Sequence, residues 1–187
     1  MQGVRDKWNR RYREREPQPP AVPEFLPELA GRLRPGRVLD VGAGDGAASL
    51  WLAEQGFDVT AVDIAEAGLE RLERFAGERQ LQIRTACLDL GSDNGIGALG
   101  TFDSVLVCRY KPDARLWPQL AAVLVPGGTL ALVTFNLEHH RRTGFSERFC
   151  LAPGELLAVE PRLEVVEYGS LECDGACLDR YLFRNKG

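Results

Sequence analysis

The sequence has no apolar run approaching the roughly 20 residues needed to cross a bilayer, and it opens on Met-Gln-Gly-Val-Arg-Asp-Lys rather than on an apolar signal segment. We therefore expect no membrane partner and a cytoplasmic location. Histidine is scarce, with two residues, and the five cysteines are odd in number and follow no metal-ligand spacing. The sequence thus predicts reduced thiols and no metal site.

An excess of positive charge is also missing, because the 187 residues carry a formal net charge of −4. Affinity for nucleic acid comes largely from Lys and Arg, so this balance argues against a nucleic-acid partner. A basic cluster does occur between Arg5 and Arg15, but Asp6, Glu14 and Glu16 interrupt or follow it. This alternation is typical of a solvated helix face.

The length fits one domain of residues 1–187, which we divide into three parts. Residues 1–35 form an N-terminal helical and proline-rich segment, with helices expected at 5–16 and 24–34. Trp8 and Tyr12 stand four apart and share one face of the first helix. Residues 36–135 form a cofactor-binding core, and residues 136–187 form a substrate-side loop and a C-terminal hairpin.

What the core does contain is an alternation of short apolar strands and amphipathic helices. The predicted strands are 37–41, 57–62, 81–87, 102–108 and 129–135, and the predicted helices are 46–55, 65–76 and 115–125. Such a pattern indicates a mostly parallel sheet covered on both faces. The tail predicts a polar loop at 136–150, a short helix at 153–159, and an antiparallel edge hairpin from 162–169 and 176–184. The fold class is thus α/β, a doubly wound, Rossmann-like sheet of seven strands.

A glycine-rich turn joins the first predicted strand to the first core helix, in the run Asp40-Val41-Gly42-Ala43-Gly44-Asp45-Gly46. Glycines let the backbone turn tightly and let a ligand approach where a Cβ would intrude. The following helix N-terminus offers free N–H groups. This pattern predicts a nucleotide or cofactor site, and it also satisfies the looser dinucleotide fingerprint, so NAD stays open at this point.

Three carboxylates follow predicted strands or lie at their ends. Asp40 is placed to reach the ammonium of a methionine moiety, and Asp63 ends the second strand, where it can accept from both ribose hydroxyls of an adenosine. Asp89 follows the third strand and is placed to accept from an adenine amino group, while the Leu90 amide meets a ring nitrogen. A loop Asp often makes only a turn, which is the simpler interpretation of Asp89.

Residues 37–135 resemble class I S-adenosylmethionine-dependent methyltransferases. The likeness is carried by the glycine motif, Asp63, the Asp89-Leu90 step, and Leu124-Val125-Pro126-Gly127-Gly128 before the fifth strand. A narrower resemblance is to the small tellurite-resistance-type and thiopurine-methyltransferase-like branch. It is carried by Trp8-Asn9-Arg10-Arg11-Tyr12, by Arg109-Tyr110 and by the short tail.

The resemblance implies S-adenosylmethionine as cofactor and an N-terminal aromatic segment that folds over it. The acceptor it implies is small: a chalcogen anion, a thiol or another metabolite. The full set of cofactor contacts that we predict is Tyr12, Asp40, Gly42, Ala43, Gly44, Gly46, Asp63, Ile64, Asp89, Leu90 and Cys108.

Candidate catalytic residues follow the fourth and fifth strands. Arg109 would hold an anionic acceptor and Tyr110 would line the methyl-transfer channel; otherwise they make a salt bridge and a packed aromatic. His139 would serve as a general base, or it belongs to an exposed basic loop. The run Cys108-Arg109-Tyr110-Lys111-Pro112 lacks the Pro-Pro-aromatic pattern of amino-methyltransferases of DNA or protein glutamine, which disfavours that class.

We therefore predict methyl transfer to a small molecule. Two other functions stay open. A non-catalytic sensor domain would bind the cofactor without turnover, and a nicotinamide-dependent oxidoreductase would bind NAD(P) but needs a second catalytic region. The sequence leaves the acceptor atom and the oligomeric state open.

Overall fold

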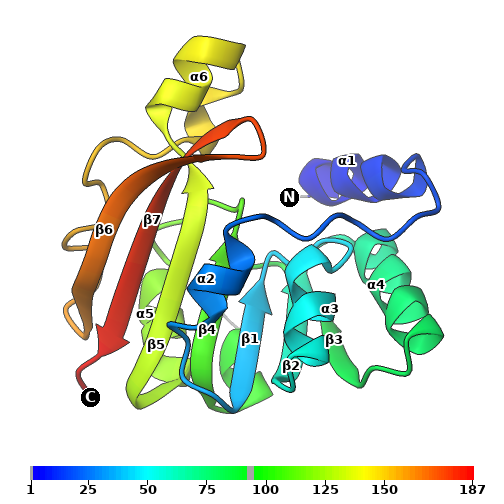
Figure 1. Cartoon of the computed structure of the whole chain (residues 1–187), viewed down its shortest axis with the longest axis horizontal. Helices are drawn as coiled ribbons and strands as arrows, with labels where there is room; N and C mark the ends of the chain where they lie inside the picture. The colour runs from blue at the N-terminus through cyan, green and yellow to red at the C-terminus, as the bar shows by residue number, and fades with distance from the viewer. Residues whose placement is uncertain (1, 92–94) are drawn as a thin grey trace.

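The structure, a computed structural model, describes residues 2–91 and 95–187, and over these residues one seven-stranded sheet organises the protein (Figure 1). The strand order is β3-β2-β1-β4-β5-β7-β6. The strands are β1 (Arg37–Val41), β2 (Asp58–Asp63), β3 (Ile83–Cys87), β4 (Phe102–Cys108), β5 (Leu124–Phe135), β6 (Leu163–Cys173) and β7 (Ala176–Asn185). The predicted fold class is confirmed.

The five strands from β1 to β5 are parallel, as their apolar character predicts. The chain builds β1, β2 and β3 outward and then returns to place β4 on the other side of β1. This return creates a switch point between β1 and β4, and ligands of such sheets bind beyond the carboxyl ends of the strands there.

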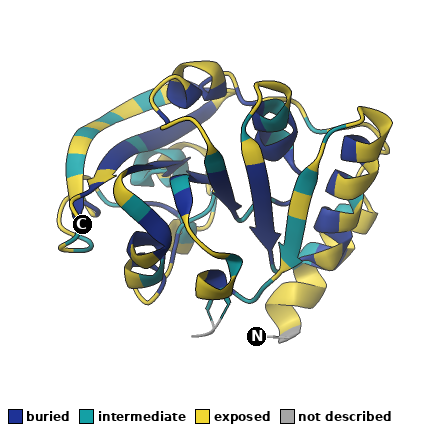
Figure 2. Cartoon of the chain, turned by 90° about the horizontal axis from the view of Figure 1, so that it is seen from below, coloured by how far each residue is buried: buried dark blue, intermediate teal, exposed yellow. Residues whose placement is uncertain are grey.

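Helices cover both faces of the parallel part. They are α3 (Ala47–Glu54), α4 (Glu66–Glu78) and α5 (Trp117–Val123), with a 3₁₀ turn η1 (Ile96–Leu99). Figure 2 shows buried residues on the sheet-facing sides of the helices and exposed residues outside. Trp117 of α5 is 2% exposed and packs against Phe183 of β7, with ring centroids 5.8 Å apart. The core therefore reaches under the C-terminal strands.

The C-terminal hairpin is antiparallel, as predicted. β7 lies between β5 and β6 and runs antiparallel to both, with Phe135 opposite Leu178. The start of β7 therefore lies beside the carboxyl end of β5. The turn between β6 and β7 therefore lies at the same end of the sheet as the glycine-rich loop, the end where the parallel strands have their carboxyl termini.

Four local predictions were wrong. The loop expected at 136–150 contains α6 (Leu137–Thr143) and the 3₁₀ turn η2 (Glu147–Phe149), because the Asn136 side chain caps α6 by accepting from the Glu138 and His139 N–H groups. The helix expected at 153–159 is a series of turns, with Gly154 at φ +69°. The helix expected at 24–34 is only α2 (Leu26–Ala30), and the helix expected at 115–125 ends at Val123 because Leu124 is extended.

The N-terminal helix α1 (Gln2–Arg13) begins and ends three residues earlier than predicted and lies against α4. Figure 1 shows α1, α6 and the β6–β7 turn at the edge of the sheet where the parallel strands end. In the described part of the chain, no helix has the length and apolar character that a membrane crossing requires.

Candidate functional site

The glycine-rich loop leaves β1 in a conformation that side chains rarely adopt. Gly42, Gly44 and Gly46 have φ values of +73°, +57° and +88°. The loop is held against the neighbouring strand, because the Gly42 and Ala43 N–H groups donate to the Val62 carbonyl at 2.9 and 3.0 Å. The α3 helix begins directly after Gly46 without a side-chain cap, so its first N–H groups face this loop.

Two tyrosines cover the loop from different sides. A Cβ on Gly42 would come within 3.0 Å of Tyr110, and one on Gly44 would collide with the Tyr12 hydroxyl. Burial raises the pKa of both phenols, that of Tyr110 to about 12, and the nearby Asp63 carboxylate raises both further. Both hydroxyls therefore stay protonated and can donate hydrogen bonds.

Asp63 ends β2 and faces the same loop. Its two carboxylate oxygens each accept a backbone N–H at 2.8 Å, one from Gly44 and one from Ala65. Burial raises its pKa, and the two backbone bonds partly offset this by stabilising the ionised form. A carboxylate offers about four acceptor positions, so Asp63 keeps capacity for two further donors such as ribose hydroxyls.

Asp40 is the more deeply buried carboxylate, with 1% of its surface exposed. Its Oδ2 accepts from the Ser49 hydroxyl at 2.6 Å, whereas Oδ1 is buried without a hydrogen-bond partner among the described residues. Burial raises its pKa from 3.8 to about 6, and Asp63 adds to this, while the Ser49 bond opposes it. An ionised, half-satisfied carboxylate beside a glycine loop is suited to receive a ligand's cationic group.

The helix α1 is fastened over the site by polar contacts. The Asn9 side chain accepts from the Ala67 N–H at 2.9 Å, and the Trp8 and Tyr12 rings stack with centroids 6.1 Å apart. Just beyond α1, Arg15 pairs at 2.6 Å with the loop carboxylate Asp45. Sequence reasoning missed the roles of Asn9, Asp45 and Ser49, although Asn9 and Asp45 lie inside motifs it had singled out.

The remaining predicted cofactor residues lie around this loop. Leu90 is buried in the core cluster that includes Val41 and Val62, and the Ile64 carbonyl accepts from the Cys87 thiol at 3.6 Å. Asp89 accepts from the Gly91 N–H at 3.0 Å, which is the turn-making role. Cys108 ends β4; burial raises the pKa of its thiol well above the ordinary value, and Asp40 adds to this.

Two of the predicted catalytic residues, Arg109 and His139, make structural contacts: Arg109 forms a salt bridge and His139 packs on an aromatic ring. Arg109 has a left-handed backbone, with φ +53°, and its guanidinium binds Asp174 of the β6–β7 turn at 2.6 Å. This is the salt bridge that the sequence left open. His139 stacks on Phe135 at 4.7 Å and lies on α6, not on an exposed loop; its Nδ1 is buried without a partner among the described residues.

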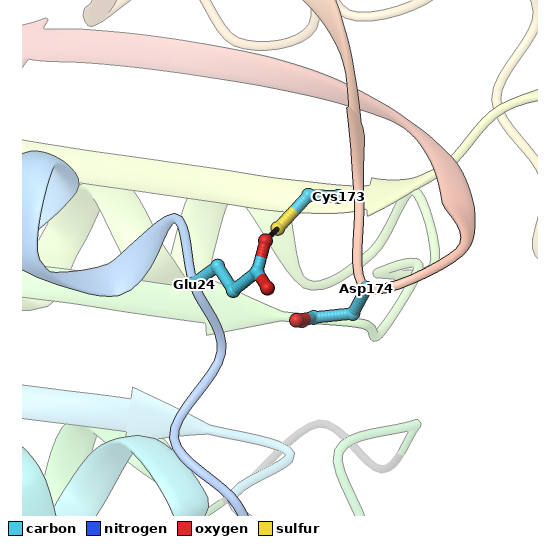
Figure 3. Close-up of side chains that lie close together, drawn as sticks. All are labelled: Glu24, Cys173 and Asp174. Atoms are coloured by element: carbon cyan, nitrogen blue, oxygen red, sulfur yellow. Dashed lines mark hydrogen bonds between the residues drawn. The ribbon is translucent and has the colours of Figure 1, made fainter.

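A cavity of about 450 Å³ lies beside these residues. It is lined by Glu24, His139, Arg142, Thr143 and residues 172–177. Figure 3 shows the Glu24 carboxylate beside the Cys173 sulfur, and the Asp174 carboxylate extending toward Glu24 from the turn that follows Cys173. One ligand atom from each of these three residues lies within 4.8 Å of the others. No spacing in the sequence marks this cluster, because 149 positions separate Glu24 from Cys173.

These features fit S-adenosylmethionine. Asp40 has an oxygen without a partner for an ammonium group, Asp63 has acceptor capacity for ribose hydroxyls, and the glycine loop gives close backbone approach between them. The fold and the site together define the class I S-adenosylmethionine-dependent methyltransferase architecture. In agreement, residues 38–128 match the family described as "Methyltransferase domain".

Curated relatives are methyltransferases of different kinds. The chain is 33% identical over 116 residues to the ubiquinone biosynthesis O-methyltransferase of Bordetella avium, covering 60% of this chain and 48% of the relative. It is 33% identical over 120 residues to ribosomal RNA small subunit methyltransferase C of Chromohalobacter salexigens, covering 59% and 34%. The chain thus spans about half or less of the length of these relatives.

Solved structures share the fold over more of the chain. One, described with the conversion of a disulfide bond into a thioacetal group during echinomycin biosynthesis, has a TM-score of 0.80 at 17% identity, covering 97% of this chain and 91% of the other. TehB from Haemophilus influenzae has a TM-score of 0.67 at 22% identity, covering 86% and 61%. At these identities the likeness shows the fold alone.

Proposed function

We propose that this protein binds S-adenosylmethionine and transfers its methyl group to a small-molecule acceptor. The observation that carries the proposal is the meeting of Asp40, Asp63 and the left-handed glycine loop at the carboxyl edge of β1 and β2. Asp40 would bind the ammonium group and Asp63 the ribose hydroxyls. Asp89, Leu90 and Ile64 would surround the adenine.

The chain's own residues would act by positioning. When bound, the cofactor supplies the electrophilic methyl carbon on a sulfonium. A lone pair of the acceptor forms the new bond to that carbon while the carbon–sulfur bond breaks, and its electron pair stays on the sulfur of S-adenosylhomocysteine. Tyr12 and Tyr110, which cover the glycine loop, would align the two molecules and exclude water.

The narrower likeness to the tellurite-resistance-type branch belongs to this proposal. The N-terminal helix supports it, because Tyr12 lies on the glycine loop and Asn9 fastens the helix to α4. The net charge of −4 supports a small acceptor over nucleic acid. We also propose a cytoplasmic location, where the five cysteines would stay free thiols, as they are in the structure.

Isothermal titration with S-adenosylmethionine, S-adenosylhomocysteine and NAD tests the cofactor assignment. We expect binding of the first two and a loss of at least tenfold in Asp63→Ala, since this change removes hydrogen bonds to a charged acceptor, worth roughly 1.5–3 kcal/mol. Asp58→Ala is the matched control, because Asp58 is an exposed carboxylate at the opposite end of the same strand. Binding of NAD alone, or equal binding by both variants, would contradict the proposal. Binding without turnover on any small acceptor would favour the sensor domain.

A further inference from the structure

The cavity beside the β6–β7 turn is assembled from three separate segments. Glu24 lies before α2, His139 to Thr143 lie on α6, and residues 172–177 form the turn and its flanks. Its volume of about 450 Å³ is within the range of pockets that hold small molecules.

The cavity opens on the edge of the sheet that carries the glycine loop. β4 and β5 run parallel to β1, and Phe135 at the end of β5 lies opposite Leu178 near the start of β7. Arg109, the first residue after β4, reaches the turn and binds Asp174 there. The cavity is therefore on the acceptor side of the proposed cofactor site.

Together with Arg109, the segments that build the cavity carry one more carboxylate than guanidinium groups. Three carboxylates have guanidinium partners: Arg109 binds Asp174, Arg141 binds Glu138, and Arg142 binds Glu172, at N–O distances of 2.6, 2.8 and 2.8 Å. Glu24 has no cationic partner among the described residues. Within the described ranges, its side chain accepts one weak hydrogen bond, from the Cys173 thiol at 3.7 Å.

The lining of the cavity combines the ion-paired side chains of Arg142, Glu172 and Asp174 with uncharged residues of the β6–β7 turn. Cys173, Ala176 and Cys177 are all at least 91% buried. Burial raises the pKa of the Cys173 thiol, and the Asp174 and Glu24 carboxylates raise it further, so this thiol stays protonated. A ligand in the cavity therefore meets neutral thiols, carboxylates that already have guanidinium partners, and the exposed Glu24 carboxylate, which has no cationic partner among the described residues.

We propose that this cavity holds the methyl acceptor and that the acceptor is a small organic ammonium compound. Its cationic group binds Glu24 as an anchor, and a different atom of the acceptor, one that carries a lone pair, receives the methyl group. The inference rests on the proposed function. A small anion does not fit, because the guanidinium of Arg109 is bound to Asp174 and that of Arg142 to Glu138 and Glu172, so an anionic group would face Glu24 without a free cationic partner. A divalent cation fits less well, because it would compete with Arg109 for Asp174 and require loss of the Cys173 proton.

Three probes of similar shape and different charge test the inference: phenethylamine, 2-phenylethanol and phenylacetate, each titrated into the protein saturated with S-adenosylhomocysteine. We expect phenethylamine to bind most tightly and phenylacetate most weakly. Glu24→Gln should weaken phenethylamine binding roughly tenfold or more and leave 2-phenylethanol unchanged, because it removes a charge-assisted hydrogen bond. Glu164→Gln, which neutralises an exposed carboxylate on β6 outside the cavity, should leave all three affinities unchanged.

Equal affinities, a preference for phenylacetate, or no measurable binding of the amine would overturn the inference. Tight binding of Zn²⁺ alone that is lost in both Glu24→Gln and Cys173→Ser would overturn it in favour of a metal centre. S-adenosylmethionine binding is measured on cofactor-free portions of the same protein preparations. If S-adenosylmethionine does not bind, the proposed function is refuted. If it binds but phenethylamine does not bind more tightly than the other two probes, only the proposed class of acceptor is refuted.

Discussion

Replacing Asp40 by Asn tests two effects of the buried carboxylate separately: its effect on the free energy of unfolding and its effect on S-adenosylmethionine binding. Asn has the same shape, keeps an oxygen for the Ser49 hydroxyl, and carries no charge. In the native protein the pKa of Asp40 rises from 3.8 to about 6, mainly through burial. A difference of this size corresponds to about 3 kcal/mol of folding free energy that is lost when the group ionises.

The direction of the pH dependence follows from linkage. Because the folded-state pKa lies above the unfolded value, the protonated carboxyl contributes stability below about pH 4, and this contribution is lost as the pH rises through 6. The variant has no such loss. The free energy of unfolding of Asp40→Asn relative to the native protein should therefore increase by about 2 kcal/mol between pH 4.5 and pH 7.5.

Guanidinium unfolding followed by circular dichroism at both pH values measures this difference. A constant offset, such as a buried amide N–H without a partner, cancels between the two pH values. Asp58→Asn, which removes an exposed charge from β2, is the control. A relative stability that stays constant, or falls, with rising pH would refute the reasoning. The same variant should bind S-adenosylmethionine more weakly at pH 7.5, since the ammonium group loses its anionic partner.

Two other variants test how the site is built. Deleting residues 1–15 should weaken S-adenosylmethionine binding severalfold in titration calorimetry. The shortened protein should keep the circular dichroism spectrum of a folded core, because α1 is mostly exposed and packs on α4. An unfolded product or unchanged affinity would contradict the role of α1 over the glycine-rich loop. Asn136→Ala should lower the free energy of unfolding by about 1–2 kcal/mol, since it removes both the cap of α6 and a 2.8 Å bond to Asp179, which is 2% exposed. A change below about 0.5 kcal/mol, the usual effect of a surface substitution, would show that the cap contributes little.

Most of the sheet could be predicted because the local sequence pattern of each strand indicates a strand. Arg37–Val41 and Phe102–Cys108 are short segments rich in apolar residues, and their predicted and observed limits agree. The helix α6 was missed because the stretch around His139 is polar on all sides. Its start signal was present, since Asn136 is a favoured N-cap residue and Glu138 lies in the first turn.

The candidate site, too, has a part that could be predicted from the sequence and a part that could not. The glycine loop and Asp63 could be predicted, because their spacing along the chain is fixed by one strand-loop-helix-strand unit. Contacts between distant segments could not. Arg109 and Asp174 are 65 positions apart, and Arg15 and Asp45 are 30 apart, and no periodicity relates them. The cofactor roles of Asp40 and Asp63 remain predictions, which the titrations with S-adenosylmethionine test.

The two-residue turn of the C-terminal hairpin has a consequence for how this enzyme class can diversify. Asp174 and Gly175 have φ values of +49° and +70°, the pair of left-handed conformations that a tight hairpin turn requires and that Asp, Asn and Gly accept best. Replacing Asp by Asn at position 174 is therefore expected to preserve the backbone while it removes the anionic partner of Arg109. If the proposed acceptor cavity is correct, replacing one carboxylate oxygen by an amino group would cancel its excess negative charge without disturbing the sheet, and acceptor choice could then change at little cost in stability.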